Sequence, residues 1–61
     1  MARKLKYWRK RRGLSQEELA KRADVGRSYL ARLETARHDP TLSTLKKLAK
    51  ALRVKVGRLL E

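Results

Sequence analysis

QEELAKRADVGRSYLARLET, residues Gln16–Thr35, is the stretch of sequence that decides the fold. It predicts two short helices joined by a tight turn, because apolar residues recur at helical spacing in each half: Leu19, Ala20, Ala23, Leu30 and Leu33. Ala20 is small enough to let a crossing helix approach closely, and Val25 fills the corner between the two helices. Asp24 occupies the turn, where a left-handed backbone is usually needed and aspartate is tolerated better than most residues. Together these positions predict a helix-turn-helix motif.

The start of the first of these helices is marked by a capping box. Ser15 stands at the N-cap and Glu18 at the third helical position, and Leu14 is placed to pack onto Leu19 as a hydrophobic staple. Glu17 and Glu18 each precede a basic residue by four positions, a spacing that allows weak ion pairs along the helix. These carboxylates therefore have structural roles, and we do not interpret them as a catalytic pair.

The rest of the chain predicts further helices around this motif, within one all-α domain of five helices over residues 1–61. The expected helices are 3–12, 16–23, 27–35, 42–52 and 56–60. Gly13 is expected to end the first helix as its C′ residue, and Thr41 to cap the fourth. The fifth helix is signalled only weakly, because Gly57 lies inside it and Lys55 is a poor cap.

Charge is the strongest compositional signal. The 61 residues contain 18 Lys and Arg against 6 Asp and Glu, a formal net charge of +12. So large an excess predicts a polyanionic partner, with nucleic acid ahead of the alternatives. A thermophilic or solubility-selected surface would interleave the cations with more glutamate. An anionic membrane could bind the basic first helix, but Leu5 and Trp8 are too few apolar anchors for that role.

Catalytic and metal chemistry have little support in the sequence. There is no cysteine and only one histidine, His38, which stands alone in a basic loop. No glycine-rich phosphate loop is present, and we expect no enzyme activity, no metal and no cofactor. No stretch has the length of a membrane span or the pattern of a secretory signal, so a cytoplasmic protein is expected.

Three runs carry a resemblance to a known family: W-R-x-x-R-G-L-S-Q-E-E-L-A from Trp8, V-G-R-S-Y-L-A-R-L-E from Val25, and P-T-L-S-T-L-K-K-L-A-K-A-L from Pro40. They cover nearly the whole chain, which resembles the Cro/repressor-like, or xenobiotic-response-element type, helix-turn-helix DNA-binding domains. The resemblance implies a compact lambda-repressor-like fold. It also implies a bacterial, phage or archaeal origin.

The resemblance assigns roles to individual residues. Bases would be read by Arg27, Ser28 and Arg32, since arginine can present two donors to guanine. Phosphates would be bound by Ser15, Gln16, Tyr29, Thr35, Arg37 and His38. Arg9 and Glu34 would form an ion pair that ties the first helix to the recognition helix. The alternative for the two arginines is a solvated helix face, and for Lys46, Lys47 and Lys50 that alternative is preferred.

The sequence departs from the family pattern at several positions. Gly26 replaces the usual Ser or Thr cap, and Gly57 enters the last helix. Asp24 and Ala36 stand where the family often has glycine, so strain or an altered turn is expected at these two residues. Arg53 replaces another glycine that is common in the family. None of these departures falls on the expected recognition face.

The leading functional prediction is sequence-specific binding of double-stranded DNA by a transcriptional regulator, a repressor by the habit of the family. The alternatives are an antitoxin-type interaction module that also binds its own operator, and a non-specific nucleic-acid coating protein. A near-palindromic operator and a homodimer on DNA are expected. The dimer surface would consist of Val54, Val56, Leu59 and Leu60. Equally, these residues can cap the core over Leu48 and Leu52.

Overall fold

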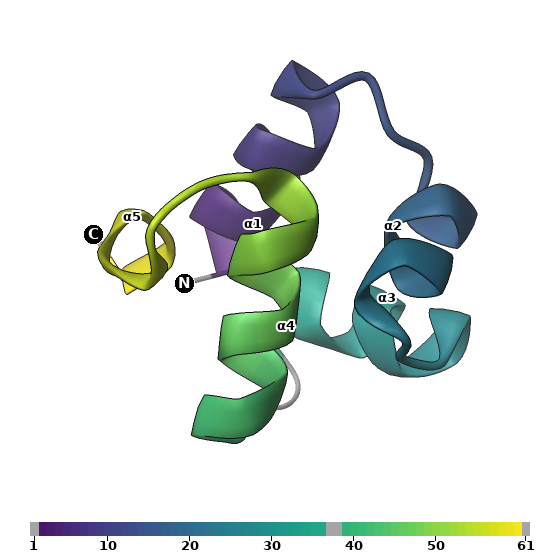
Figure 1. Ribbon diagram of the computed structural model, residues 1–61. Helices are drawn as coiled ribbons and strands as arrows, with labels where there is room; N and C mark the ends of the chain where they lie inside the picture. Colours follow the sequence, from purple (N-terminus) through teal and green to yellow (C-terminus); the bar gives the residue numbers. More distant parts are fainter. Residues whose placement is uncertain (1, 37–38, 61) are drawn as a thin grey trace.

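The computed structural model describes residues 2–36 and 39–60, and all regular structure in these ranges is helical. The helices are α1 (Ala2–Arg11), α2 (Gln16–Ala23), α3 (Arg27–Glu34), α4 (Leu42–Leu52) and α5 (Val56–Leu60). In Figure 1, α4 runs through the middle of the view with α2 and α3 on one side and α5 on the other. The all-α, five-helix prediction is confirmed. None of the helices in the described ranges is long and apolar enough to cross a bilayer.

The core is built almost entirely from leucine and alanine. Its buried members come from every helix and from the α1–α2 turn: Leu5, Leu14, Leu19, Ala20, Ala23, Leu30, Leu33, Leu45, Leu48, Ala49, Leu52 and Leu59. α4 packs against α2, and α1 packs against both α3 and α5. The helix-turn-helix is thus supported from behind by α1 and α4.

The capping box at the start of α2 is confirmed. Ser15 Oγ accepts a hydrogen bond of 3.0 Å from the Glu18 backbone N–H, and Glu18 Oε1 accepts one of 2.9 Å from the Ser15 backbone N–H. Leu14 and Leu19 on either side of the cap are both buried, as a hydrophobic staple requires. The first turn of α2 is therefore fixed by local sequence.

The ionisation of Glu18 makes part of the stability depend on pH. The Ser15 backbone N–H, then the Ser15 side chain and the charge of Arg22, hold the pKa of the Glu18 carboxyl below its ordinary value of 4.5. Because the folded-state pKa lies below the unfolded one, the carboxylate stabilises the fold above the unfolded pKa. This contribution is lost as the pH falls through the folded pKa.

Glu18→Gln, which cannot ionise, should therefore flatten the fall of Tm with pH below the unfolded pKa of 4.5. Thermal unfolding followed by circular dichroism, from neutral to acid pH, measures the effect. Glu17→Gln is the matched control, since it removes a neighbouring carboxylate outside the capping box. A plot of Tm against pH for Glu18→Gln that runs parallel to that of the unmodified protein would contradict the expected coupling between Glu18 ionisation and stability.

Three helix ends differ from the expected bounds by one residue. α1 ends at Arg11 rather than at residue 12, because the Gly13 N–H bonds to the Lys10 carbonyl and the Leu14 N–H bonds to the Arg9 carbonyl. Gly13 has φ of +70°, so the two bonds form a Schellman motif around it. α1 also begins at residue 2 instead of 3, and α3 ends at 34 with residue 35 as its C-cap.

The three departures from glycine do place side-chain-bearing residues in the left-handed region. The φ angles are 56° at Asp24, 61° at Ala36 and 58° at Arg53. Asp24 and Arg53 each follow a helix at the position that glycine usually occupies in a Schellman motif. The backbone strain expected at Asp24 and Ala36 is thus present, and Arg53 carries the same strain.

Arg53→Gly should therefore stabilise the domain by about 0.5–1 kcal/mol. A non-glycine residue in the left-handed region costs about 1–2 kcal/mol, and the substitution relieves this strain. Glycine also loses more backbone entropy on folding, which offsets about 0.5–1 kcal/mol of the gain. Urea unfolding measures the change. Lys47→Gly, in the exposed interior of α4, is the control and should instead destabilise by about 1 kcal/mol. A loss of stability in Arg53→Gly would show that the Arg53 side chain matters more than its backbone strain.

Arg12 joins α1 to the end of α4. Its Nε donates to the Leu52 carbonyl at 2.8 Å and its Nη2 to the Arg53 carbonyl at 3.4 Å. The Arg12 guanidinium carbon also lies 5.4 Å from the centroid of the Trp8 ring. Arg12 thus satisfies carbonyl groups that a helix end leaves without partners.

The position of Leu59 differs from the expected dimer surface. Its side chain is fully buried in the core of its own chain, so its assignment to a pairing surface is wrong. Val54 and Val56 are partly buried and pack against the same core. Leu60 is the exposed member, with 61% of its surface accessible.

Candidate nucleic-acid interface

α3 divides cleanly into an inner and an outer face. Leu30 and Leu33 are fully buried, whereas Arg27, Ser28 and Arg32 are all exposed. These three are the residues expected to read bases, and the fold presents them to solvent on one helix. Gly26 caps α3 in an extended conformation without a side-chain hydrogen bond, as its lack of a side chain dictates.

The turn before α3 sets the direction of the helix. Asp24 adopts the left-handed conformation, and the Val25 N–H donates to the Ala20 carbonyl at 3.0 Å. Val25 then packs against the core from the corner, and Ala20 is buried where α2 meets its neighbours. The turn and the core together fix how α3 crosses α2.

Arg9 and Glu34, the ion pair that the resemblance implies, are in direct contact. Arg9 Nε lies 2.6 Å from Glu34 Oε2, and Arg9 Nη2 donates to Glu34 Oε1 at 3.1 Å, so the pair is bidentate. Arg9 Nη1 donates to the Leu14 carbonyl at 2.9 Å. Only 11% of the Arg9 side chain and 3% of the Glu34 side chain are exposed.

Gln16 completes this arrangement from α2. Its Nε2 donates to Glu34 Oε1 at 3.1 Å, so Glu34 accepts hydrogen bonds from α1 and α2 at once. We refer to Arg9, Gln16 and Glu34 as the brace. Because the brace fastens the last residue of α3 to both preceding helices, it orients α3.

A second contact to α3 was not predicted from the sequence. Glu17 Oε2 lies 4.0 Å from Arg27 Nη1, and Glu17 Oε1 lies 3.9 Å from Lys21 Nζ. All three side chains are at least 60% exposed, so these pairs add little to stability. The Glu17–Arg27 pair places the Arg27 guanidinium beside α2. Sequence alone signalled only the Glu17–Lys21 spacing.

Four of the six expected phosphate-binding residues lie within the described part of the chain. Ser15 and Thr35 are exposed, and Gln16 and Tyr29 are partly buried. Thr35 Oγ1 donates to the Arg32 carbonyl at 3.0 Å, so its hydroxyl hydrogen must exchange this bond before it can bind a phosphate. Arg37 and His38 lie outside the described residues. Among residues 2–36 and 39–60 no group of His, Cys, Asp or Glu is arranged to bind a metal.

Comparison with known proteins identifies the family. Residues 5–59 match the family model described as Helix-turn-helix. The chain is 46% identical over 54 residues to the immunity repressor protein of Bacillus phage phi105, a match that covers 88% of this chain and 38% of the repressor. It is 41% identical over 56 residues to an HTH-type transcriptional regulator of Methanocaldococcus jannaschii, covering 92% of this chain and 85% of the regulator.

Solved structures agree with the sequence matches. The fold superposes with a TM-score of 0.94 on SinR, the master regulator for biofilm formation, in complex with DNA; the match has 36% identity and covers 98% of this chain and 97% of SinR. The restriction-modification controller C.AhdI of Aeromonas hydrophila superposes with a TM-score of 0.93 at 34% identity, covering 95% of this chain and 88% of the controller. The chain therefore belongs to the helix-turn-helix family of DNA-binding transcriptional regulators, which is not a family of enzymes.

Proposed function

We propose that the domain represses transcription by reading an operator through α3, which enters the major groove with Arg27, Ser28 and Arg32 toward the bases. One observation carries this proposal. Two exposed arginines and a short serine project from a helix whose inner face is buried and whose end is fixed by the brace. A rigid helix with such a face has the size and the donors that major-groove recognition requires. The structural similarity to SinR bound to DNA supports the proposal.

The phosphate backbone is bound on both sides of α3. The proposed contacts are Ser15, Gln16, Tyr29, Thr35, Arg37 and His38. Gln16 uses one amide hydrogen for Glu34 and retains a second that can reach a phosphate. A phosphate contact at Gln16 would therefore be made without breaking the brace. Because its partner is chromosomal or phage DNA, the protein acts in the cytoplasm.

Two copies of the domain bind one near-palindromic operator. One recognition helix reads only a few base pairs, and twofold pairing places two such helices in successive major grooves about 34 Å apart. The pairing surface comprises Val54, Val56 and Leu60, the accessible apolar residues at the end of the chain. The charge of +12 on each copy opposes pairing, so we expect weak association in solution and cooperative pairing on DNA.

Selection of bound duplexes from a random pool tests the proposal. The expected result is an enriched near-palindrome that binds about a thousandfold more tightly than random DNA. Sedimentation with and without this duplex should show two chains on the operator and mainly single chains without DNA. Binding that never exceeds a few-fold preference would favour a coating protein, and one chain per operator would contradict the twofold arrangement.

A further inference from the structure

A second concentration of positive charge lies away from α3. It combines the end of α1, the last turn of α2, the outer face of α4 and the α4–α5 turn. We refer to it as the basic band, and its members are all exposed: Arg12, Arg22, Lys47, Lys50, Arg53 and Lys55. The band and the residues expected to read bases lie on different sides of α2. On one side of this helix, Glu17 and Lys21 line a hollow together with Arg27. On the other side, Arg22 lines a hollow together with residues of α4.

The basic band is continuous across three neighbouring surface hollows. The first, of about 420 Å³, is lined by Arg22, Lys47, Lys50 and Arg53 among others. The second, of about 200 Å³, shares Arg22 and Arg53 with the first and adds Arg12. The third, of about 400 Å³, shares Arg12 and Arg53 with the second and adds Lys55. An open row of cationic hollows suits an extended polyanion better than a small molecule.

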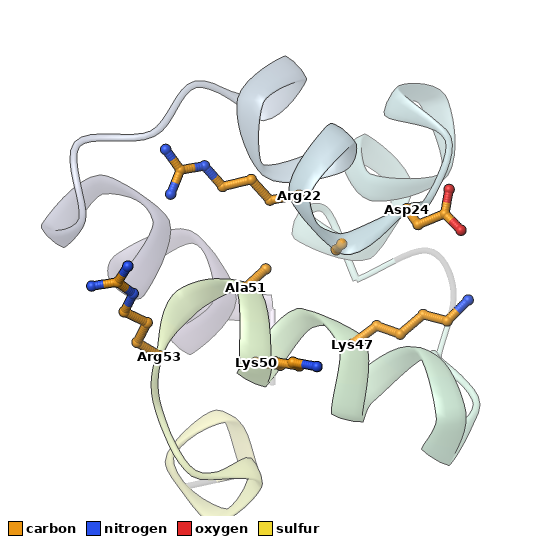
Figure 2. A pocket seen from close by; sticks show the side chains of 7 residues that line it. Arg22, Asp24, Lys47, Lys50, Ala51 and Arg53 are labelled. Atoms are coloured by element: carbon orange, nitrogen blue, oxygen red, sulfur yellow. The ribbon is translucent and has the colours of Figure 1, made fainter.

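Acidic residues hardly compensate this charge. Asp24 is the one carboxylate among the residues that line the three hollows. Figure 2 shows the Arg22 and Arg53 side chains extending toward the same side of the first hollow, from α2 and from the end of α4. Like charges gathered in this way repel one another and oppose the folded state unless a polyanion neutralises them.

Helix ends explain part of the basic band but not all of it. Cations near the C-termini of α2 and α4 interact favourably with the helix dipoles, which accounts for Arg22 and Lys50. Arg12 is held by the carbonyls of residues 52 and 53. Lys47 lies in the middle of α4, however, and Lys55 lies beyond its end, so neither stabilises a helix terminus.

We infer that the basic band binds the phosphate backbone of a second DNA duplex, so that one domain joins the operator on α3 to another DNA segment. Nucleic acid is favoured over an acidic protein because the centre of the band is polar. A protein interface needs a desolvated apolar or aromatic core. Among the apolar residues that line the hollows, Leu14, Ala23 and Leu52 are buried in the core of the domain, and Trp8 and Ala51 are partly buried. Val54, which also lines the third hollow, is assigned to the pairing surface and not to the band. Phosphate contacts need only exposed cations.

The test uses the full chain saturated with a short duplex that carries the selected operator. A second duplex without the operator, labelled with a different dye, is then titrated in and followed by fluorescence anisotropy. The unmodified protein should bind it in a salt-dependent manner while the operator stays bound. A variant combining Lys47→Gln, Lys50→Gln and Arg53→Gly should bind the second duplex about tenfold or more weakly. Its salt slope should fall by about 2–3, since each neutralised phosphate contributes about 0.9.

A charge-matched variant separates the effect of the residues in the basic band from the effect of a lower net charge. Lys6→Gln, Lys10→Gln and Arg11→Gln also remove three exposed cations, all from α1, and should leave second-duplex binding within about threefold. Circular dichroism checks that each variant is folded. If the band variant is unfolded, the double variant Lys47→Gln, Lys50→Gln replaces it, and its salt slope should fall by about 2. The Arg27→Ala, Arg32→Ala protein should lose its preference for the operator and still bind the second duplex through the band. A failure of the proposed recognition by α3 can therefore be told apart from a failure of binding at the band.

Three outcomes would overturn the inference. Second-duplex binding that is unchanged in the band variant would assign the binding elsewhere, and so would binding that falls equally in both triple variants. Polyglutamate that displaced the labelled duplex at a lower charge concentration than unlabelled duplex would identify an acidic protein as the ligand.

Discussion

Glu34→Ala should lower the free energy of unfolding by about 3–5 kcal/mol, the largest stability effect expected in this domain. The substitution leaves the Arg9 guanidinium, only 11% exposed, without its charged partner, and an unpaired buried charge costs about that much. It also removes the acceptor of Gln16 Nε2. Small domains are stable by only about 5–15 kcal/mol, so the variant should lose a large share of its stability. Urea or thermal unfolding measures the loss.

A double-mutant cycle supplies the control. Arg9→Met with Glu34→Ala should recover part of the stability, because the methionine needs no charged partner and fills much of the same space. Additive effects of the two single substitutions would mean that the pair contributes no coupling energy. Gln16→Ala, which leaves the bidentate pair intact, should cost only about 1 kcal/mol.

Arg27→Ala and Arg32→Ala should each weaken binding to the selected operator by about 1–3 kcal/mol and relax the preference at particular base pairs. Each arginine can donate two hydrogen bonds to one guanine, and alanine leaves those acceptors without partners. Binding to random DNA should fall much less, since phosphate contacts supply most of it. Repeating the selection with each variant shows which base pairs lose their preference.

Lys21→Ala is the matched control for the two arginines. It removes a cation that is 79% exposed and lies beside the same Glu17 carboxylate as Arg27. It should leave the selected sequence unchanged and reduce affinity only through net charge. Full sequence preference in both arginine variants would show that α3 does not read the bases through these residues.

Local signals explain which features the sequence predicted well. The capping box involves residues only three positions apart, and Gly13 fixes the end of α1 through its own left-handed backbone. Helical spacing identified the buried leucines of α3 and α4, because each presents a single apolar face. Such features depend on neighbours in the chain, so sequence can reveal them.

Contacts between distant segments could not be predicted in the same way. The hydrogen bond from Arg12 to the Leu52 carbonyl joins residues forty positions apart, and a basic run such as 9–12 gives no sign of which arginine will cap another helix. The Glu17–Arg27 contact depends on the angle between two helices. In α5, a helix of five residues, both faces carry apolar side chains, so spacing could not show that Leu59 and not Leu60 is buried.

The brace has a consequence for how such a regulator acquires a new target. The fully buried side chains of α3 are Leu30 and Leu33 on its inner side, and its buried ion pair is made by its last residue, Glu34. Positions 27, 28 and 32 contribute nothing to the core. Their side chains can therefore be exchanged for those of another regulator while the scaffold stays folded. With the base contacts proposed for α3, a few substitutions on this one exposed face would be enough to change the operator that the domain binds.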